Sequence, residues 1–198
     1  RRRPLVFYGT SITQGGCASR PGMAHVALLG RWLDRPVVNL GFSGNGTMDP
    51  EMADLLAELD AAAYVIDCLP NLSPEGVSER TGPLVERLRQ GRPVTPIVLV
   101  EDRTLTNAAL LPERQEHHRR MRAALATAVA RLRDCGVEHL HVAPGAGLLG
   151  EDGEATVDGS HPTDLGFHRQ ATALLPLLRS LCDAEERACS SAAPPAPR

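Results

Sequence analysis

The chain has 198 residues, enough for one domain with a single large core, and 42% of them are hydrophobic, as in an ordinary globular protein. Its formal net charge of −3 argues against a protein that binds nucleic acid or an anionic membrane surface. All 21 basic residues are arginine, so lysine-dependent chemistry such as Schiff-base catalysis is excluded.

The cysteines are odd in number and have no zinc-type spacing, which favours free thiols in a reducing compartment; they are Cys17, Cys68, Cys135, Cys182 and Cys189. No signal-peptide pattern and no apolar run long enough to cross a bilayer is present. We therefore expect a cytoplasmic protein without a membrane partner.

Apolar segments and helix-like segments alternate along the chain. Buried strands are predicted over residues 5–8, 36–40, 63–67, 94–100 and 138–142. Helices are predicted over residues 24–33, 50–59, the second half of 73–90, 112–135 and 162–181. This alternation predicts a parallel sheet with helices on both faces, because parallel strands need right-handed crossovers.

The last part of the chain differs in composition from the rest. Residues 184–198 are rich in Ala, Pro and Ser. A disordered tail is therefore predicted there, which leaves residues 1–183 as the folded domain.

The segment 9–16 follows the first strand and is small, polar and glycine-rich, so the chain must turn there. The turn brings the Ser11 hydroxyl to the carboxyl end of a strand, where ligands bind in open α/β sheets. Such a serine can also do no more than cap a helix. A Walker-type phosphate loop is not indicated, because no Gly-Lys-Ser/Thr sequence closes the segment.

Other polar groups follow later strands and should reach the same edge of the sheet. Nucleophilic acyl transfer needs a hydroxyl, a base, a group that orients the base, and donors for the oxyanion. Ser11 can supply the hydroxyl, His161 the base and Asp158 the orienting carboxylate. The backbone N–H groups of Ser11 and Gly44 and the side-chain amide of Asn71 can supply the donors.

Simpler interpretations of these residues remain open at this point. Asp158 could only shape a turn, His161 could only precede the helix that follows, and Asn71 could only be a turn residue. Asp158 and His161 could also bind a metal, although no further ligand cluster accompanies them. Arg20 and Arg103 follow loops at the same edge and could either bind an acidic substrate or lie solvated at the surface.

Taken together, four segments of the chain resemble the sequence blocks of the SGNH, or GDSL-type, esterase and lipase superfamily. They are Gly9-Thr10-Ser11-Ile12, Gly41-Phe42-Ser43-Gly44, the segment from Asp67 to Asn71, and Asp158-Gly159-Ser160-His161. The resemblance runs from about Leu5 to Leu181. It implies a Ser11 nucleophile, oxyanion donors at Gly44 and Asn71, and an Asp158–His161 pair.

The chain departs from the family pattern at two places. Thr10 stands where the family usually has Asp, a residue that supports the loop and does no chemistry. Pro70 and Leu72 flank Asn71 in place of the usual Gly and Asp, which affects how the Asn71 amide is aimed. The resemblance is strongest to a subgroup that carries an upstream β-rich domain.

From the residues and the resemblance we predict a three-layer, flavodoxin-like α/β sandwich with strand order 2-1-3-4-5. The predicted function is serine-dependent hydrolysis of a small ester through an acyl-enzyme, without metal or cofactor. An O-acyltransferase that uses the same residues is the first alternative. A non-catalytic binding module is the second. The acyl and alcohol groups recognised and the oligomeric state do not follow from the sequence.

Overall fold

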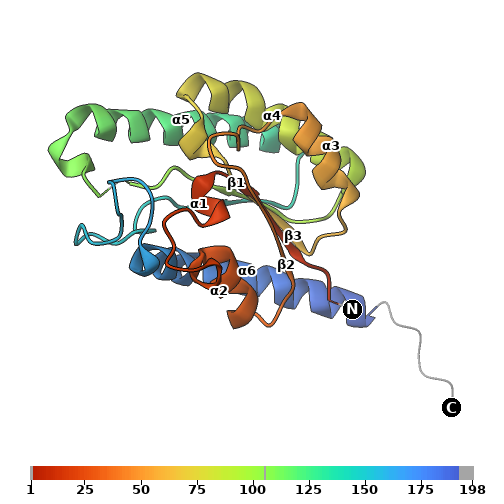
Figure 1. The fold of residues 1–198 in the computed structure, drawn as a ribbon. Coiled ribbons are helices and arrows are strands. Elements are labelled where there is room, and N and C mark those ends of the chain that lie inside the picture. The colour runs from red at the N-terminus through yellow and green to blue at the C-terminus, as the bar shows by residue number, and fades with distance from the viewer. Residues whose placement is uncertain (1, 105, 192–198) are drawn as a thin grey trace, which may run out of the picture.

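A parallel five-stranded sheet forms the middle layer of the computed structural model, which describes residues 2–104 and 106–191 (Figure 1). The strands are β1 (Leu5–Gly9), β2 (Val37–Gly41), β3 (Ala63–Asp67), β4 (Ile97–Val100) and β5 (Leu140–Ala143). They pair in the order β2-β1-β3-β4-β5. The predicted fold class and strand order are confirmed.

Helices cover both faces of the sheet. One face packs against α3 (Pro50–Glu58), α4 (Pro74–Gly91) and α5 (Pro112–Asp134). The other packs against α2 (His25–Trp32) and α6 (Asp164–Ser191). Alternation along β3 shows why both layers are needed: Tyr64 and Ile66 join the first core, whereas Ala63 and Val65 join the second.

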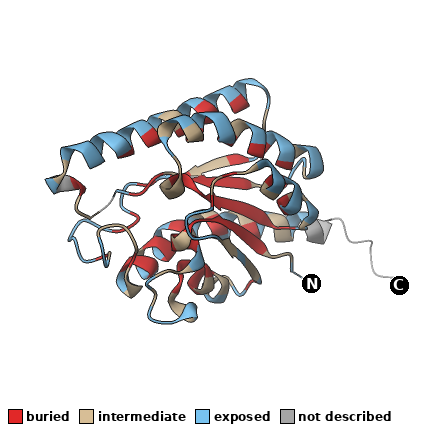
Figure 2. Ribbon diagram, turned by 45° about the horizontal axis from the view of Figure 1, so that its top comes forward, coloured by how far each residue is buried: buried red, intermediate tan, exposed pale blue. Residues whose placement is uncertain are grey.

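The central strands are buried along their whole length, whereas β2 at the edge is only partly covered (Figure 2). β1 lies between β2 and β3, with Gly9 in register with Gly41 and Asp67. Three strands therefore end at the same level, and the short helices α1 (Ser11–Gln14) and η2 (Leu69–Asn71) begin just beyond that edge. Two further short helices are η1 (Pro21–Met23) and η3 (Ala108–Leu110).

Helix α4 begins earlier than the sequence predicted. It runs without interruption from Pro74, and Gly82 and Pro83 lie inside it. The Ser73 hydroxyl accepts a hydrogen bond from Gly76 N at 3.2 Å and caps the helix. Val77 and Thr81 are fully buried in the first half, so packing outweighs the low helix propensity of the Gly-Pro pair.

Helix α6 continues to Ser191, so the tail predicted from residue 184 is wrong for residues 184–191. An ion-pair cluster that composition does not show holds the first part of this segment against the fold. Glu185 pairs with Arg3 and with the buried Arg35, both at 2.9 Å, and Glu186 pairs with Arg35 at 2.7 Å. Residues 192–198 lie outside the described residues.

Within the described part of the chain, no helix is both long and apolar enough to cross a bilayer. Cys17, Cys68, Cys135 and Cys182 are free thiols.

Candidate active site

Ser11 is the first residue of α1, directly beyond the end of β1. The helix cap is supplied by Thr10, whose hydroxyl accepts from Ile12 N at 3.2 Å. Thr10, which replaces the family's usual Asp, thus supports the loop. The Ser11 side chain is not needed as a cap and lies half-buried at the edge of the sheet.

His161 and Asp158 lie beside Ser11 although 150 residues separate Ser11 from His161. Ser11 Oγ is 2.8 Å from His161 Nε2, and His161 Nδ1 is 2.7 Å from Asp158 Oδ2. An ionised carboxylate only accepts hydrogen bonds, so Nδ1 donates to Asp158 and Nε2 is left to accept from the serine hydroxyl. The three side chains form a continuous chain of hydrogen bonds.

The Asp158–His161 turn is held by the same carboxylate. Asp158 Oδ1 accepts from His161 N at 2.7 Å and from Ser160 N at 2.9 Å. Gly159 has a φ of +88°, which permits this tight turn. The hydrogen bonds from the His161 backbone and ring lower the pKa of Asp158 to about 2, so the carboxylate is ionised at neutral pH.

The loop that follows β2 packs against the start of the Ser11 segment. Phe42 N donates to Gly9 O at 2.9 Å. A Cβ atom added to Gly46 would lie 2.1 Å from the same oxygen, so only glycine permits this contact. Gly44, at the exposed tip, has a φ of +72° and open space where a Cβ atom would be. The loop is therefore held against Gly9 on both sides of Gly44, through Phe42 and Gly46.

The Asn71 side chain lies against this loop. In the amide orientation that satisfies its neighbours, Oδ1 accepts from the N–H groups of Gly44, Asn45 and Gly46 at 3.3, 3.2 and 3.2 Å. The amide NH₂ then points away from these three donors and remains a potential hydrogen-bond donor. Asn71 and Gly44 are thus brought together, and the Gly44 N–H faces Asn71.

The two arginines considered either as substrate contacts or as solvated surface residues have different positions. Arg20 is exposed, and its Nη1 lies 3.4 Å from Ser19 Oγ, near the site loops. Arg103 is 0% exposed, and its Nη2 donates to both carboxylate oxygens of Asp67 at 2.6 Å. The position of Arg103 therefore contradicts both interpretations, as a substrate contact and as a solvated surface arginine, because its charge is paired with Asp67 inside the protein.

Sequence reasoning missed Gly16, which packs beneath the serine and the histidine. A Cβ atom there would lie 3.7 Å from Ser11 Cβ and 3.8 Å from His161 Cδ2. It also missed Asp164, which accepts from the Ser19 backbone and hydroxyl and so ties the start of α6 to the loop after α1. The Gly15-Gly16 pair was the only sequence signal for the contact of Gly16 with Ser11 and His161. No sequence signal indicated the contact of Asp164 with Ser19.

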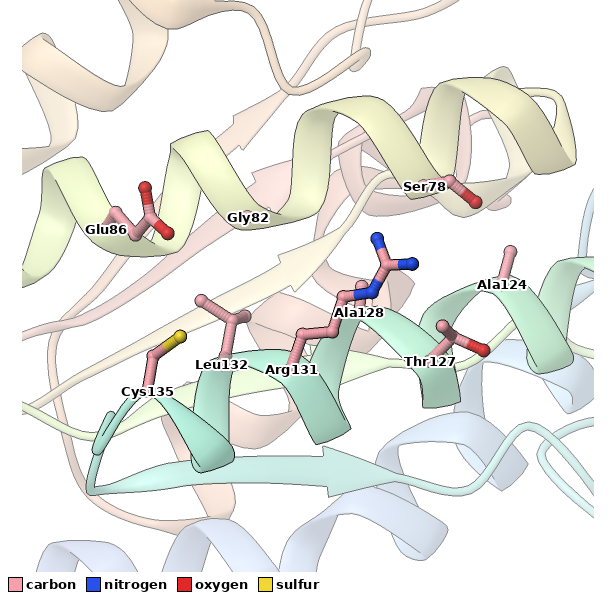
Figure 3. Close-up of a pocket in the computed structure, with 9 residues that line it drawn as sticks. All are labelled: Ser78, Gly82, Glu86, Ala124, Thr127, Ala128, Arg131, Leu132 and Cys135. Atoms are coloured by element: carbon pink, nitrogen blue, oxygen red, sulfur yellow. The ribbon is translucent and has the colours of Figure 1, made fainter.

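A separate cleft of about 230 Å³ lies between α4 and α5 (Figure 3). It is lined by Ser78, Gly82, Glu86, Ala124, Thr127, Ala128, Arg131, Leu132 and Cys135. None of the predicted site residues lines it. The described residues also contain no group of three or more His, Cys, Asp or Glu side chains that could hold a metal ion.

Comparison with solved structures gives similar proteins that are mostly longer than this chain. A protein of Bacteroides ovatus described as a GDSL-like lipase is 40% identical, with a TM-score of 0.88, and the match covers 91% of this chain but 54% of that one. The salicylyl-acyltransferase SsfX3 from a tetracycline biosynthetic pathway is 20% identical, with a TM-score of 0.78. The match covers 91% of this chain and 55% of SsfX3. The chain spans about half the length of these two proteins.

A smaller protein matches over nearly its whole length. The aryl esterase of M. smegmatis is 20% identical, with a TM-score of 0.64, and the match covers 90% of this chain and 99% of the esterase. No curated protein sequence matches the chain. The model of the GDSL-like lipase/acylhydrolase family matches residues 2–179. The chain therefore belongs to the GDSL-like lipase/acylhydrolase family.

Proposed function

We propose that the protein hydrolyses a small ester through an acyl-enzyme formed on Ser11. The observation that carries the proposal is the hydrogen-bond chain from Ser11 Oγ to His161 Nε2 at 2.8 Å and from His161 Nδ1 to Asp158 at 2.7 Å. A hydroxyl, a base and an orienting carboxylate at these distances are what nucleophilic acyl transfer requires.

In the first half-reaction, Ser11 Oγ attacks the ester carbonyl while His161 Nε2 accepts the hydroxyl proton. The tetrahedral intermediate then collapses, the bond to the alcohol oxygen breaks, and His161 returns the proton to the leaving alkoxide. In the second, a water molecule gives its proton to His161 and attacks the acyl-enzyme. The acid leaves, and Ser11 recovers its proton.

The oxyanion is assigned to three donors: the Ser11 N–H, the Gly44 N–H and the Asn71 NH₂ group. Asn71 lies against the Gly44 loop, which in turn packs on Gly9 next to Ser11. In the free protein the Gly44 N–H donates to Asn71 Oδ1 at 3.3 Å. For both groups to donate to the oxyanion, the Asn71 amide turns over and brings its NH₂ group to the Gly44 side, where the oxyanion replaces Oδ1 as the acceptor.

A panel of chromogenic esters that differ in acyl length, assayed with wild-type protein and Ser11→Ala, tests this function. Hydrolysis by the wild type and its loss in Ser11→Ala support it. An organophosphonate that fails to label the wild-type protein at Ser11 would instead indicate a binding module with a catalytically silent site.

The same acyl-enzyme can pass its acyl group to an alcohol in place of water, because both reactions share the first half-reaction. Adding small alcohols to the ester assay separates the two outcomes. An acyltransferase forms mainly the new ester at low alcohol concentration, whereas a hydrolase forms mainly the free acid.

A further inference from the structure

A buried cluster of polar side chains lies at the carboxyl ends of the central strands. Asp67 ends β3, Arg103 follows β4, His25 begins α2, and Gln170 lies within α6. Each of the four is at most 1% exposed. His25 packs between the rings of Phe7 and Phe167, which places the cluster in the layer between the sheet and α2 and α6. The proposed triad uses none of these side chains.

Asp67 is the centre of the cluster. Arg103 Nη2 donates to both of its carboxylate oxygens at 2.6 Å, and Gln170 Nε2 donates to Oδ2 at 3.3 Å. Gln170 Nε2 also lies 3.4 Å from His25 Nε2. Burial lowers the pKa of His25 to about 4, so His25 is neutral at pH 7. The cluster therefore holds one anion and one cation.

The arrangement is not the one that stability alone would favour. Replacing a buried ion pair with apolar side chains of similar volume is often neutral or stabilising, because desolvation of the charges is costly. Several buried polar atoms also lack a protein partner among the described residues: Arg103 Nε and Nη1, Gln170 Oε1 and His25 Nδ1. A buried pair of this kind can instead serve to fix the geometry of the segments that it joins.

The cluster joins segments that carry parts of the proposed site. Asp67 is followed directly by the turn that ends at Asn71, in which Asn71 N donates to Cys68 O at 3.1 Å. Gln170 belongs to α6, which begins three residues after His161. We propose that the Asp67–Arg103 pair, completed by Gln170, positions Asn71 so that its amide NH₂ is aimed at the oxyanion. This role rests on the proposed function, because it acts through the donor assigned there.

The test removes both charges at once, since removing one would leave the other buried and unpaired. In Asp67→Leu/Arg103→Met we expect a folded protein whose kcat falls about 10- to 100-fold with little change in KM, as for a misplaced transition-state contact. Adding Asn71→Ala to this variant should lower kcat much less than Asn71→Ala lowers that of the wild type. Additive losses would overturn the proposal, because a merely structural role predicts them.

A matched control is available at the opposite end of the strands. Arg35 and Glu185 form another ion pair in which Arg35 is buried, and they lie far from Ser11 in the fold. The variant Arg35→Met/Glu185→Gln should keep the wild-type kcat per folded molecule. A loss of kcat equal to that of Asp67→Leu/Arg103→Met would show that any buried pair has this effect and would overturn the proposal.

A second readout does not depend on turnover. The side-chain NH₂ resonances of Asn71, assigned through their absence in Asn71→Ala, should shift or broaden in Asp67→Leu/Arg103→Met and stay in place in the control. Shifted resonances in a protein without esterase activity would refute the proposed function and leave the positioning of Asn71 standing. Unchanged resonances would refute the positioning role.

If Asp67→Leu/Arg103→Met does not fold, Arg103→Lys decides the question. It keeps the charge but not the reach of the guanidinium. We then expect kcat to fall roughly 10-fold at unchanged KM, with displaced Asn71 resonances. Wild-type kcat together with unchanged resonances in Arg103→Lys would overturn the proposal.

Discussion

Ser11 and His161 lie at the rim of the sheet, where neither side chain fills the core. Ser11→Ala and His161→Ala should therefore each lower kcat by about 10⁴-fold or more and leave the melting temperature nearly unchanged. The double variant should be no slower than the slower single variant, because the residues act as a unit. Ester kinetics and thermal melts measure this. A double variant far slower than both singles would contradict the nucleophile–base assignment.

Asn71 has two roles that substitution can separate. Its Oδ1 holds the Gly44 loop, whereas its NH₂ is the assigned oxyanion donor. Asn71→Asp keeps an acceptor for the loop but loses the NH₂ donor. We therefore expect kcat to fall about 10²-fold at nearly constant KM. This is the lower end of the usual range for an oxyanion donor, chosen because Pro70 and Leu72 depart from the family pattern. The melting temperature should stay closer to the wild type than in Asn71→Ala. Unchanged kcat per folded molecule in both variants would remove Asn71 from the site.

Asp158 should determine how the proposed triad responds to acid. Its pKa is lowered from 3.8 to about 2, so it favours folding above pH 3.8, and this contribution is lost as the pH falls through about 2. The carboxylate should remain ionised wherever the enzyme is active, and its Cγ chemical shift should titrate near pH 2. The difference in melting temperature between wild type and Asp158→Ala should be constant above pH 4 and shrink below it. A Cγ midpoint near 3.8 would contradict the hydrogen-bonded turn.

At the scale of elements, the end of α6 depends on charges contributed by distant segments. Arg35 lies before β2 and has 1% of its side chain exposed, so its charge needs Glu185 and Glu186 from the last turns of α6. Glu185→Gln should lower the free energy of unfolding by about 3 kcal/mol, the lower end of the range for breaking a buried pair, because Glu186 still contacts Arg35. Urea denaturation measures this. Unchanged stability would mean that these carboxylates do not anchor the helix.

The proposed site combines elements that differ in how they are held. α1 and the η2 turn follow directly from the buried strands β1 and β3, whereas Asp158 and His161 lie in a partly exposed loop before α6. That loop is tied down by the Asp158 turn and by the contact of Asp164 with Ser19. His161, the proposed base, is thus positioned by local hydrogen bonds more than by packing in the core.

At the scale of the whole molecule, stability should be greatest in the middle of the sheet. β1 and β3 are buried along their whole length and pair on both sides, whereas β2 lies at an edge and is partly exposed. Amide hydrogen exchange should therefore be slowest in residues 5–9 and 63–67 and faster in 37–41. Equal protection in the edge and central strands would contradict this expectation.

The sequence alone determined the fold class, the strand order through the family resemblance, and the residues Ser11, Gly44, Asn71, Asp158 and His161 as candidates. These follow from local information, because strand periodicity, turn-forming glycines and short sequence blocks are written in neighbouring residues. The sequence alone could not show whether these residues lie close together. The 2.8 Å separation of Ser11 Oγ and His161 Nε2 spans 150 positions in the chain.

Only the tertiary structure decided which charges are paired inside the protein. Arg103 has the local sequence of an exposed loop arginine, yet it is fully buried and paired with Asp67. Glu185 pairs with Arg35 and lies in α6, within a segment whose composition predicted a tail. Val77 and Thr81 likewise keep α4 helical ahead of a Gly-Pro pair. In each case the partner comes from another element, and burial, which local sequence does not encode, sets the energy of the contact.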